Sequence, residues 1–173
     1  MRKILALAVI PVLMLAIVTP VLAQATLLFT TDLITDGRDT AVDVGDLTVA
    51  ADGSITFQID EASTEWRLAE THLYVGDTAP RSSSPGRFPL KHEELGGVAS
   101  DSYDADEVDL VAADVNGDGI VYIAAHAELV MLIGVDPDTG EPIYAYETAW
   151  ATGDQLIGKG KNWATCFSVT LPE

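Results

Sequence analysis

The chain has 173 residues, and its 27 aspartates and glutamates against 9 lysines and arginines give a formal net charge of −18 at pH 7. Such a charge repels nucleic acid and anionic membrane, so we expect no nucleic-acid partner. Hydrophobic residues make up 48% of the chain, which is too many for a disordered acidic tail. The acidity suits a protein that binds cations or stays soluble in concentrated salt.

The N-terminus has the layout of a secretory signal peptide. Arg2 and Lys3 form a basic start, residues 4–18 are apolar, and Ala23 closes a small-residue cleavage site, with a second site two residues further on. The alternative is a retained membrane anchor, because the apolar run approaches the length of a spanning helix. Two prolines and the small-residue end favour cleavage. We therefore expect a signal-peptide helix over residues 1–23, no stable membrane anchor after its removal, and a secreted, extracellular or cell-surface location.

Residues 24–173 are expected to form a single domain of about 150 residues, long enough to bury a sizeable core. Without Arg2 and Lys3 this part of the chain holds 7 basic against 27 acidic residues, since the whole chain has 9. Cys166 is the only cysteine, so an internal disulfide is excluded in spite of the export signal. We interpret it as a buried, unreactive thiol.

The first half of the domain has the short alternating runs that are typical of β-strands. Residues 26–29 predict a short edge strand, which a loop follows. Residues 41–49 predict a strand whose apolar parity changes at Gly45, and this change indicates a β-bulge. Asp52-Gly53 then predicts a hairpin that leads into the clean alternation of residues 55–59.

Residues 66–75 and 120–133 are the two runs around which we expect the sheet to be organised, because each places one histidine among apolar neighbours. The stretch between them, residues 76–100, is rich in proline and glycine and predicts a long loop. Residues 108–111 predict a further short strand. The two histidine strands therefore belong at the centre of the sheet.

The C-terminal third continues the pattern. Residues 136–140 predict a turn, residues 142–150 a returning strand, residues 153–161 a glycine-containing loop and residues 164–171 a last strand. About eight short strands without a helical period predict an all-β, antiparallel β-sandwich of the Greek-key or jelly-roll kind over residues 24–173.

A candidate calcium loop precedes the second histidine strand. Asp114, Asn116 and Asp118 follow the D-x-N-x-D-G opening of an EF-hand loop, and Ile120 could add its carbonyl oxygen. The twelfth position holds Ala125 in place of the bidentate glutamate, and no flanking helices are evident. The alternative is a polar turn that needs no ion. Calcium is therefore the one cofactor that the sequence suggests.

Glu70, His72, His126 and Glu147 form a second candidate site. Imidazole nitrogens and carboxylate oxygens make a reasonable ligand set for zinc or another transition metal. The alternative, which we favour, is a buried polar network in which each imidazole bonds a carboxylate or a backbone carbonyl. Strand parity places Glu147 opposite the aromatic residues of its own strand, which weakens its membership.

Aromatic residues could form a stacking platform for sugar rings, although such residues more often fill a core. No nucleophile elbow, phosphate-cradling glycine loop or Cys–His pair with a catalytic context is present, so the sequence gives an enzyme little support. The six aromatics concerned are Trp66, Tyr74, Tyr144, Tyr146, Trp150 and Trp163.

The chain resembles a family of uncharacterised secreted bacterial and archaeal β domains in four strings: WRLAETHLYVG, PGRFPLKHE, VYIAAHAE and ETAWATGDQLIGKGKNWATCFSVTL. The family pattern is TETHL, GxFPxK, IAAHA, ETAWxxG and GxNWATYF, and the match runs over residues 42–171. The chain departs from it at Leu156 or Ile157, where an aromatic is usual, at Cys166, where tyrosine is usual, and in the loop of residues 114–119. The resemblance implies a secreted or surface-displayed β domain without an assigned activity. The shared positions are Glu70, Thr71, His72, Phe88, Pro89, Lys91, His126, Glu147, Trp150, Gly160, Asn162 and Trp163.

These observations predict a secreted, acidic β-sandwich that acts as an extracellular binding or structural module for a carbohydrate or protein ligand. One alternative is a metal-dependent or carbohydrate-active enzyme that uses the face of His72 and His126. Another is a subunit of an extracellular filament or matrix, which would self-associate through a free strand edge at residues 26–29.

Overall fold

The computed structural model describes residues 26–35, 41–62, 64–158 and 163–172, and nearly all regular structure in them is antiparallel β. The all-β prediction is therefore confirmed. The predicted signal-peptide helix lies outside the described residues. No helix in these ranges is long and apolar enough to cross a membrane. The strands are β1 (Leu27–Thr35), β2 (Val42–Ala50), β3 (Ile55–Ile59), β4 (Arg67–Gly76), β5 (Leu90–His92), β6 (Ser100–Tyr103), β7 (Ile120–Val135), β8 (Pro142–Ala151), β9 (Gln155–Leu156) and β10 (Thr165–Thr170).

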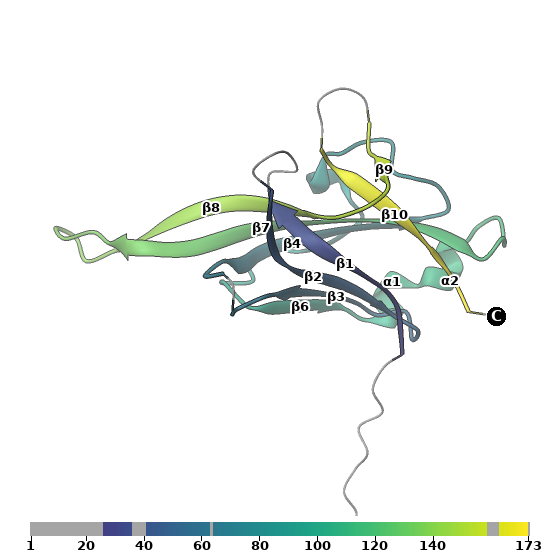
Figure 1. The fold of residues 1–173 in the computed structure, drawn as a ribbon, viewed down its shortest axis with the longest axis horizontal. Helices are drawn as coiled ribbons and strands as arrows, with labels where there is room; N and C mark the ends of the chain where they lie inside the picture. Colours follow the sequence, from purple (N-terminus) through teal and green to yellow (C-terminus); the bar gives the residue numbers. More distant parts are fainter. Residues whose placement is uncertain (1–25, 36–40, 63, 159–162, 173) are drawn as a thin grey trace, which may run out of the picture.

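The ten strands belong to one sheet that curls on itself (Figure 1). The hydrogen-bonded order is β5-β4-β7-β8-β1-β2-β3-β6, and β10 pairs with the start of β7 beside β8. The sandwich prediction is thus confirmed only in its antiparallel, all-β part. The curl brings β5 and β6, the two ends of this strand order, close together, as the bond between His92 of β5 and Asp101 of β6 shows.

The main core fills the concave side of the curled sheet. Alternation is strict in β3, where Ile55, Phe57 and Ile59 are buried and the residues between them are not. Leu47 of β2 and Leu129 of β7 face the same core from other strands. Burial of each such side chain contributes about 1.5–3 kcal/mol, so this face fixes the register of the strands.

A second, smaller cluster covers the outer face of β4, β7 and β8. It includes Phe88 from the loop before β5 and Trp150 of β8, together with Cys166 of β10, which is buried as predicted. Because β7 is covered on both faces, Val121 and residues 123–127 are all buried without alternation. This is why the sequence of β7 is apolar at consecutive positions.

Several predicted elements differ from the structure. Residues 108–111 form no strand but parts of two one-turn helices, α1 (Ala105–Val108) and α2 (Leu110–Ala113). Asp109 separates these helices with a left-handed φ of 43°, and its side chain accepts the amide of Ala112. An apolar run too short to show a period cannot distinguish such turns from a strand. The loop predicted over residues 76–100 holds β5 and the 3-10 helix Pro85–Arg87 and reaches the start of β6.

The first strand is also longer and more central than predicted. β1 runs to Thr35 and lies between β2 and β8 in the sheet. Its partner β2 has the predicted bulge, since Leu33 pairs with Gly45 and Ile34 with Asp43, which leaves Val44 as the extra residue. The change of apolar parity at Gly45 in the sequence therefore corresponds to this bulge.

β7 and β8 extend beyond the rest of the sheet as a two-stranded arm, which Figure 1 shows projecting away from the body. On one side the pairing of β7 with β4 ends at Val130, and on the other the pairing of β8 with β1 ends at Ala149. We define the arm as residues 131–148.

Candidate functional site

Three of the four candidate calcium ligands, Asp114, Asn116 and Asp118, lie in the loop before β7, and the fourth, Ile120, is the first residue of the strand. Both carboxylate oxygens of Asp114 accept backbone amides, from Gly117 at 3.0 Å and Gly119 at 2.9 Å. The side chains of Asn116 and Asp118 each accept the amide two residues on, at 2.8 and 2.9 Å. The loop is therefore held by its own side chains in turn geometry. Calcium binding stays a prediction.

His72 of β4 and His126 of β7 are directly paired across neighbouring strands. Their ring centroids lie 5.4 Å apart, and their Nδ1 atoms lie 3.4 Å apart, so one ring donates to the other. Each residue is 4% exposed. Trp150 of β8 packs edge-on against His126 with a centroid distance of 5.0 Å. The two histidine strands are thus neighbours in the sheet, but they do not lie at its centre as predicted, because β4 has only β5 beyond it in the strand order.

The surroundings keep both rings neutral. Burial lowers the pKa of His126 to about 3, and the charge that His72 acquires on protonation adds to this effect. Burial also lowers the pKa of His72, against the opposing influence of Glu128 and Glu70. The Nε2 atom of His72 lies 3.8 Å from Glu70 Oε2. Two buried neutral rings fit a polar pair inside the core better than an open catalytic cleft.

Glu147 does not join this group. It pairs with Leu129, which points into the main core, so it lies on the sheet face opposite His126. Its carboxylate accepts the amide of Thr148 at 2.9 Å. Glu128 instead lies beside Glu70, one step along the strands from the histidines. Among the described residues, no three His, Cys, Asp or Glu side chains are grouped to hold a metal ion.

His92 is a functional group that the sequence analysis missed. Its Nδ1 lies 3.0 Å from both carboxylate oxygens of Asp101, and its Nε2 lies 3.1 Å from Glu107. The ring stacks on Tyr103 with a centroid distance of 4.2 Å. Asp101 also accepts the hydroxyl of Thr71 at 2.5 Å. These bonds join β4 and β5 to β6 and α1, where no continuous strand ladder closes the curled sheet.

The same contacts set the charges in this network. Partial burial opposes the protonation of His92, but Asp101 and Glu107 together outweigh it and raise the pKa of the imidazole. Burial raises the pKa of Tyr103 to about 12, so its hydroxyl stays a proton donor. It donates to the backbone oxygen of Thr71 at 2.9 Å. The one signal in the sequence was the brief alternation of Phe88, Leu90 and His92 inside a loop rich in proline and glycine.

A groove of about 530 Å³ lies on the outer face where the arm joins the body. Its apolar floor comes from β7 and β8, and its rim from β4 and the loop after β5. Tyr144 and Tyr146 are 44% and 74% exposed, so their ring faces are open to a ligand. We call this site the tyrosine groove. It is lined by Glu65, Arg67, Ala69, Glu70, Glu94, Gly96, Gly97, Val130, Leu132, Tyr144 and Tyr146.

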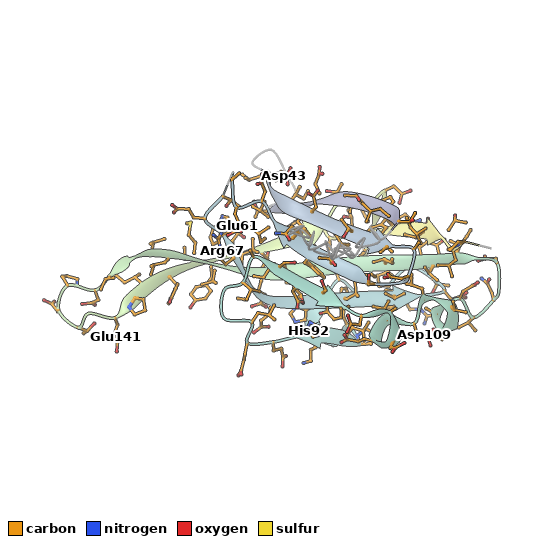
Figure 2. All side chains as sticks on the ribbon, turned by 90° about the horizontal axis from the view of Figure 1, so that it is seen from below. Asp43, Glu61, Arg67, His92, Asp109 and Glu141 are labelled. Carbon is orange, nitrogen blue, oxygen red and sulfur yellow. The ribbon has the colours of Figure 1, made fainter. Side chains whose placement is uncertain are left out.

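The charge of the tyrosine groove is negative. Its one cationic residue, Arg67, bonds Glu61 at 2.8 Å and the backbone oxygen of Trp66 at 2.7 Å. Figure 2 shows Arg67 and Glu61 close together near the base of the arm. The acidic rim residues face no second arginine or lysine in the groove lining. The groove therefore combines exposed aromatic rings with three carboxylates and one arginine in its lining, while Lys91 interacts with Glu70 from outside it.

Comparison of the chain with family models, curated proteins and solved structures found no match. The resemblance to the secreted β-domain family therefore stays a prediction.

Proposed function

We propose that the protein is an extracellular binding module that holds sugar rings in the tyrosine groove. Tyr146 carries this proposal, because a tyrosine 74% exposed beside carboxylates in a concave site has an open face for stacking. The scaffold would act as a β-sandwich in which the two halves of the curled sheet face each other. Secretion through the N-terminal segment completes the proposal.

The groove chemistry narrows the ligand class. Carboxylates accept hydrogen bonds from sugar hydroxyls, and they repel acidic sugars. Glu70, which lines the groove, lies directly opposite Glu128 on the neighbouring strand, an arrangement of like charges that is destabilising in an empty site. Lys91 already opposes this repulsion in part, and a further cationic amine near Glu70 would relieve it more fully. We therefore propose neutral or amine-bearing oligosaccharides as ligands.

The enzyme alternative receives less support. His72 and His126 are buried and bonded to each other, and the tyrosine groove lies along the strands from them. Neither ring lines that groove, so a groove-bound substrate would not reach them.

The test is calorimetric titration with three tetrasaccharides: a tetramer of glucosamine, a tetramer of N-acetylglucosamine and a tetrasaccharide that contains glucuronate. We expect saturable binding of the first two, with the amine-bearing chain binding more tightly and the acidic chain binding least. The double substitution Y144A/Y146A should abolish binding, because each stacked ring contributes on the order of 1 kcal/mol in addition to its buried area. Tyr122→Ala, on β7 outside the groove, is the matched control. Equal affinity of the double variant and the protein itself would contradict the proposal, as would failure of all three sugars to bind.

A further inference from the structure

The arm carries large apolar side chains on both of its faces, and no element among the described residues covers them. Six of them are between 43% and 74% exposed. An isolated two-stranded ribbon is marginally stable in water, and exposed apolar side chains on it are typical of an interaction surface. The six residues are Leu132, Ile133, Val135, Ile143, Tyr144 and Tyr146.

The outer edge of β8 is open to strand addition along the arm. The amide of Thr152 donates to Asp32 of β1 at 2.9 Å, so it points to the β1 side. Alternation then directs the amides of Thr148, Tyr146 and Tyr144 to the same side, and the register of β8 against β7 is unbroken through these positions. Since pairing with β1 ends at Ala149, no strand among the described residues lies beside these backbone groups.

One of these amides is already bonded by a side chain. Glu147 Oε1 accepts the amide of Thr148 at 2.9 Å. A side-chain acceptor at this position confirms that the Thr148 amide is not used by the β7–β8 ladder. A carbonyl oxygen from an added strand could replace the carboxylate, which would then be free to pair with a cation.

The charge on the arm selects the partner. The chain has no lysine or arginine between Lys91 and Lys159, so every charged side chain on the arm is acidic. Glu147 lies on one face of β8 and Tyr144 and Tyr146 lie on the other, while Glu141 directly precedes the strand. Figure 2 shows Glu141 at the tip of the arm, away from the body. A second copy of the chain would bring the same negative charges together, which is unfavourable at a net charge of −18.

We infer that the free edge of β8 binds an extended segment of another protein that alternates apolar and basic residues. The segment adds a strand beside residues 142–148. Its apolar side chains pack against Tyr144 and Tyr146, while its lysines or arginines face Glu141 and Glu147. This goes beyond the sugar-binding proposal, because the added strand bonds the backbone on the β1 side of β8, while the tyrosine groove, with which it shares Tyr144 and Tyr146, extends across β7 to β4.

The test is calorimetric titration of the purified full-length protein with two blocked seven-residue peptides. One alternates lysine with valine, and the other alternates glutamate with valine. We expect saturable binding of the lysine peptide that weakens as salt is raised, and no binding of the glutamate peptide. Equal binding of both peptides, or of neither at millimolar concentration, would overturn the inference.

The backbone contribution is isolated by comparing Tyr146→Pro with Tyr146→Ala. Both variants lose the ring, but only proline removes the amide that points to the free edge. The proline variant should bind the lysine peptide about fivefold to tenfold more weakly than the alanine variant, as expected for one lost hydrogen bond. Equal affinities would show that no strand is added at this edge.

A charge reversal keeps the test decisive if the proline variant does not fold. Glu147→Lys should weaken binding of the lysine peptide and create binding of the glutamate peptide. An unchanged preference would overturn the predicted orientation and with it the inference. Sedimentation of the protein alone provides the last check: a dimer lost in Glu147→Lys would assign the edge to a second copy and refute the basic partner.

Discussion

His126 should make the stability of the protein fall steeply in mild acid. Burial lowers its pKa to about 3 from an ordinary value of 6.5. When the pH falls below 6.5, the unfolded chain takes up a proton at this residue and the folded chain does not. The stabilisation from the neutral ring is therefore complete above pH 6.5 and is lost progressively as the pH falls towards 3.

The magnitude follows from the width of this window. The ring is 4% exposed, so solvent screening weakens the effect little. Each pH unit inside the window costs about 1.4 kcal/mol of unfolding free energy. Between pH 6.5 and pH 5.0 the loss attributable to His126 is about 2 kcal/mol, a large fraction of the stability of an ordinary domain.

The assay is urea unfolding of the protein and of His126→Asn at pH 7.5, 6.5, 5.8 and 5.0. Both proteins share the contributions of the distant titratable residues, so the difference between their pH slopes reports His126 together with its coupling to His72. We expect the variant to be less stable at pH 7.5 and to lose about 2 kcal/mol less than the protein itself by pH 5.0. Parallel curves would refute the reasoning, as would an NMR titration of the His126 ring with a midpoint near 6.5.

Three further predictions concern other contacts. The pKa of His92 is raised, so the stabilisation of the protein by the protonated ring is complete below about pH 6.5 and is lost as the pH rises through the folded pKa. Urea unfolding should therefore find His92→Gln most destabilising in acid and with almost no effect on the unfolding free energy at alkaline pH. Asp114→Ala removes the acceptor of two backbone amides and should lower the unfolding free energy by about 1–2 kcal/mol in chelator. A larger cost in calcium would show an ion site, and an equal cost would show a turn without an ion. A Cβ at Gly153 would meet the backbone oxygen of Cys166, so Gly153→Ala should lower the unfolding free energy by about 1–3 kcal/mol and lower the melting temperature accordingly. A Cβ at Gly134 would meet nothing within 4 Å, so Gly134→Ala should leave the melting temperature unchanged.

Alternation and turn chemistry predicted most strands because each depends on neighbouring residues alone. The parity change at Gly45 and the Asp52-Gly53 hairpin are local signals, and both correspond to observed features. The helices α1 and α2 were not predicted because each has one turn and their conformation depends on the left-handed residue Asp109. A single turn is too short for a helical period to show.

The candidate site was predictable only where strand parity was sufficient. Parity assigned His72 and His126 each to one face of its strand and indicated that Glu147 does not belong with them, whereas the direct pairing of the two histidines came only from the structure. It could not predict the bonds of His92 to Asp101 and Glu107, because these depend on the curl that brings the two ends of the sheet together. The contact between β5 and β6 joins the two ends of the strand order, so no pattern of neighbouring residues in the sequence predicts it.

The sequence of β7 also explains why a partner for the arm is expected and why its binding should be weak. Within the body the strand is apolar on both faces because both faces are covered, and the same composition continues into the arm, where neither face is covered. Covering the exposed part of six large side chains contributes on the order of 1 kcal/mol each, about 6 kcal/mol in total. Association costs about 4–15 kcal/mol before any net affinity appears. Apolar contact alone therefore gives little net affinity, and the backbone hydrogen bonds and the charge pairs at Glu141 and Glu147 must supply the difference. For this reason a partner should be selected by its strand pattern and its basic residues, and its binding should be sensitive to salt.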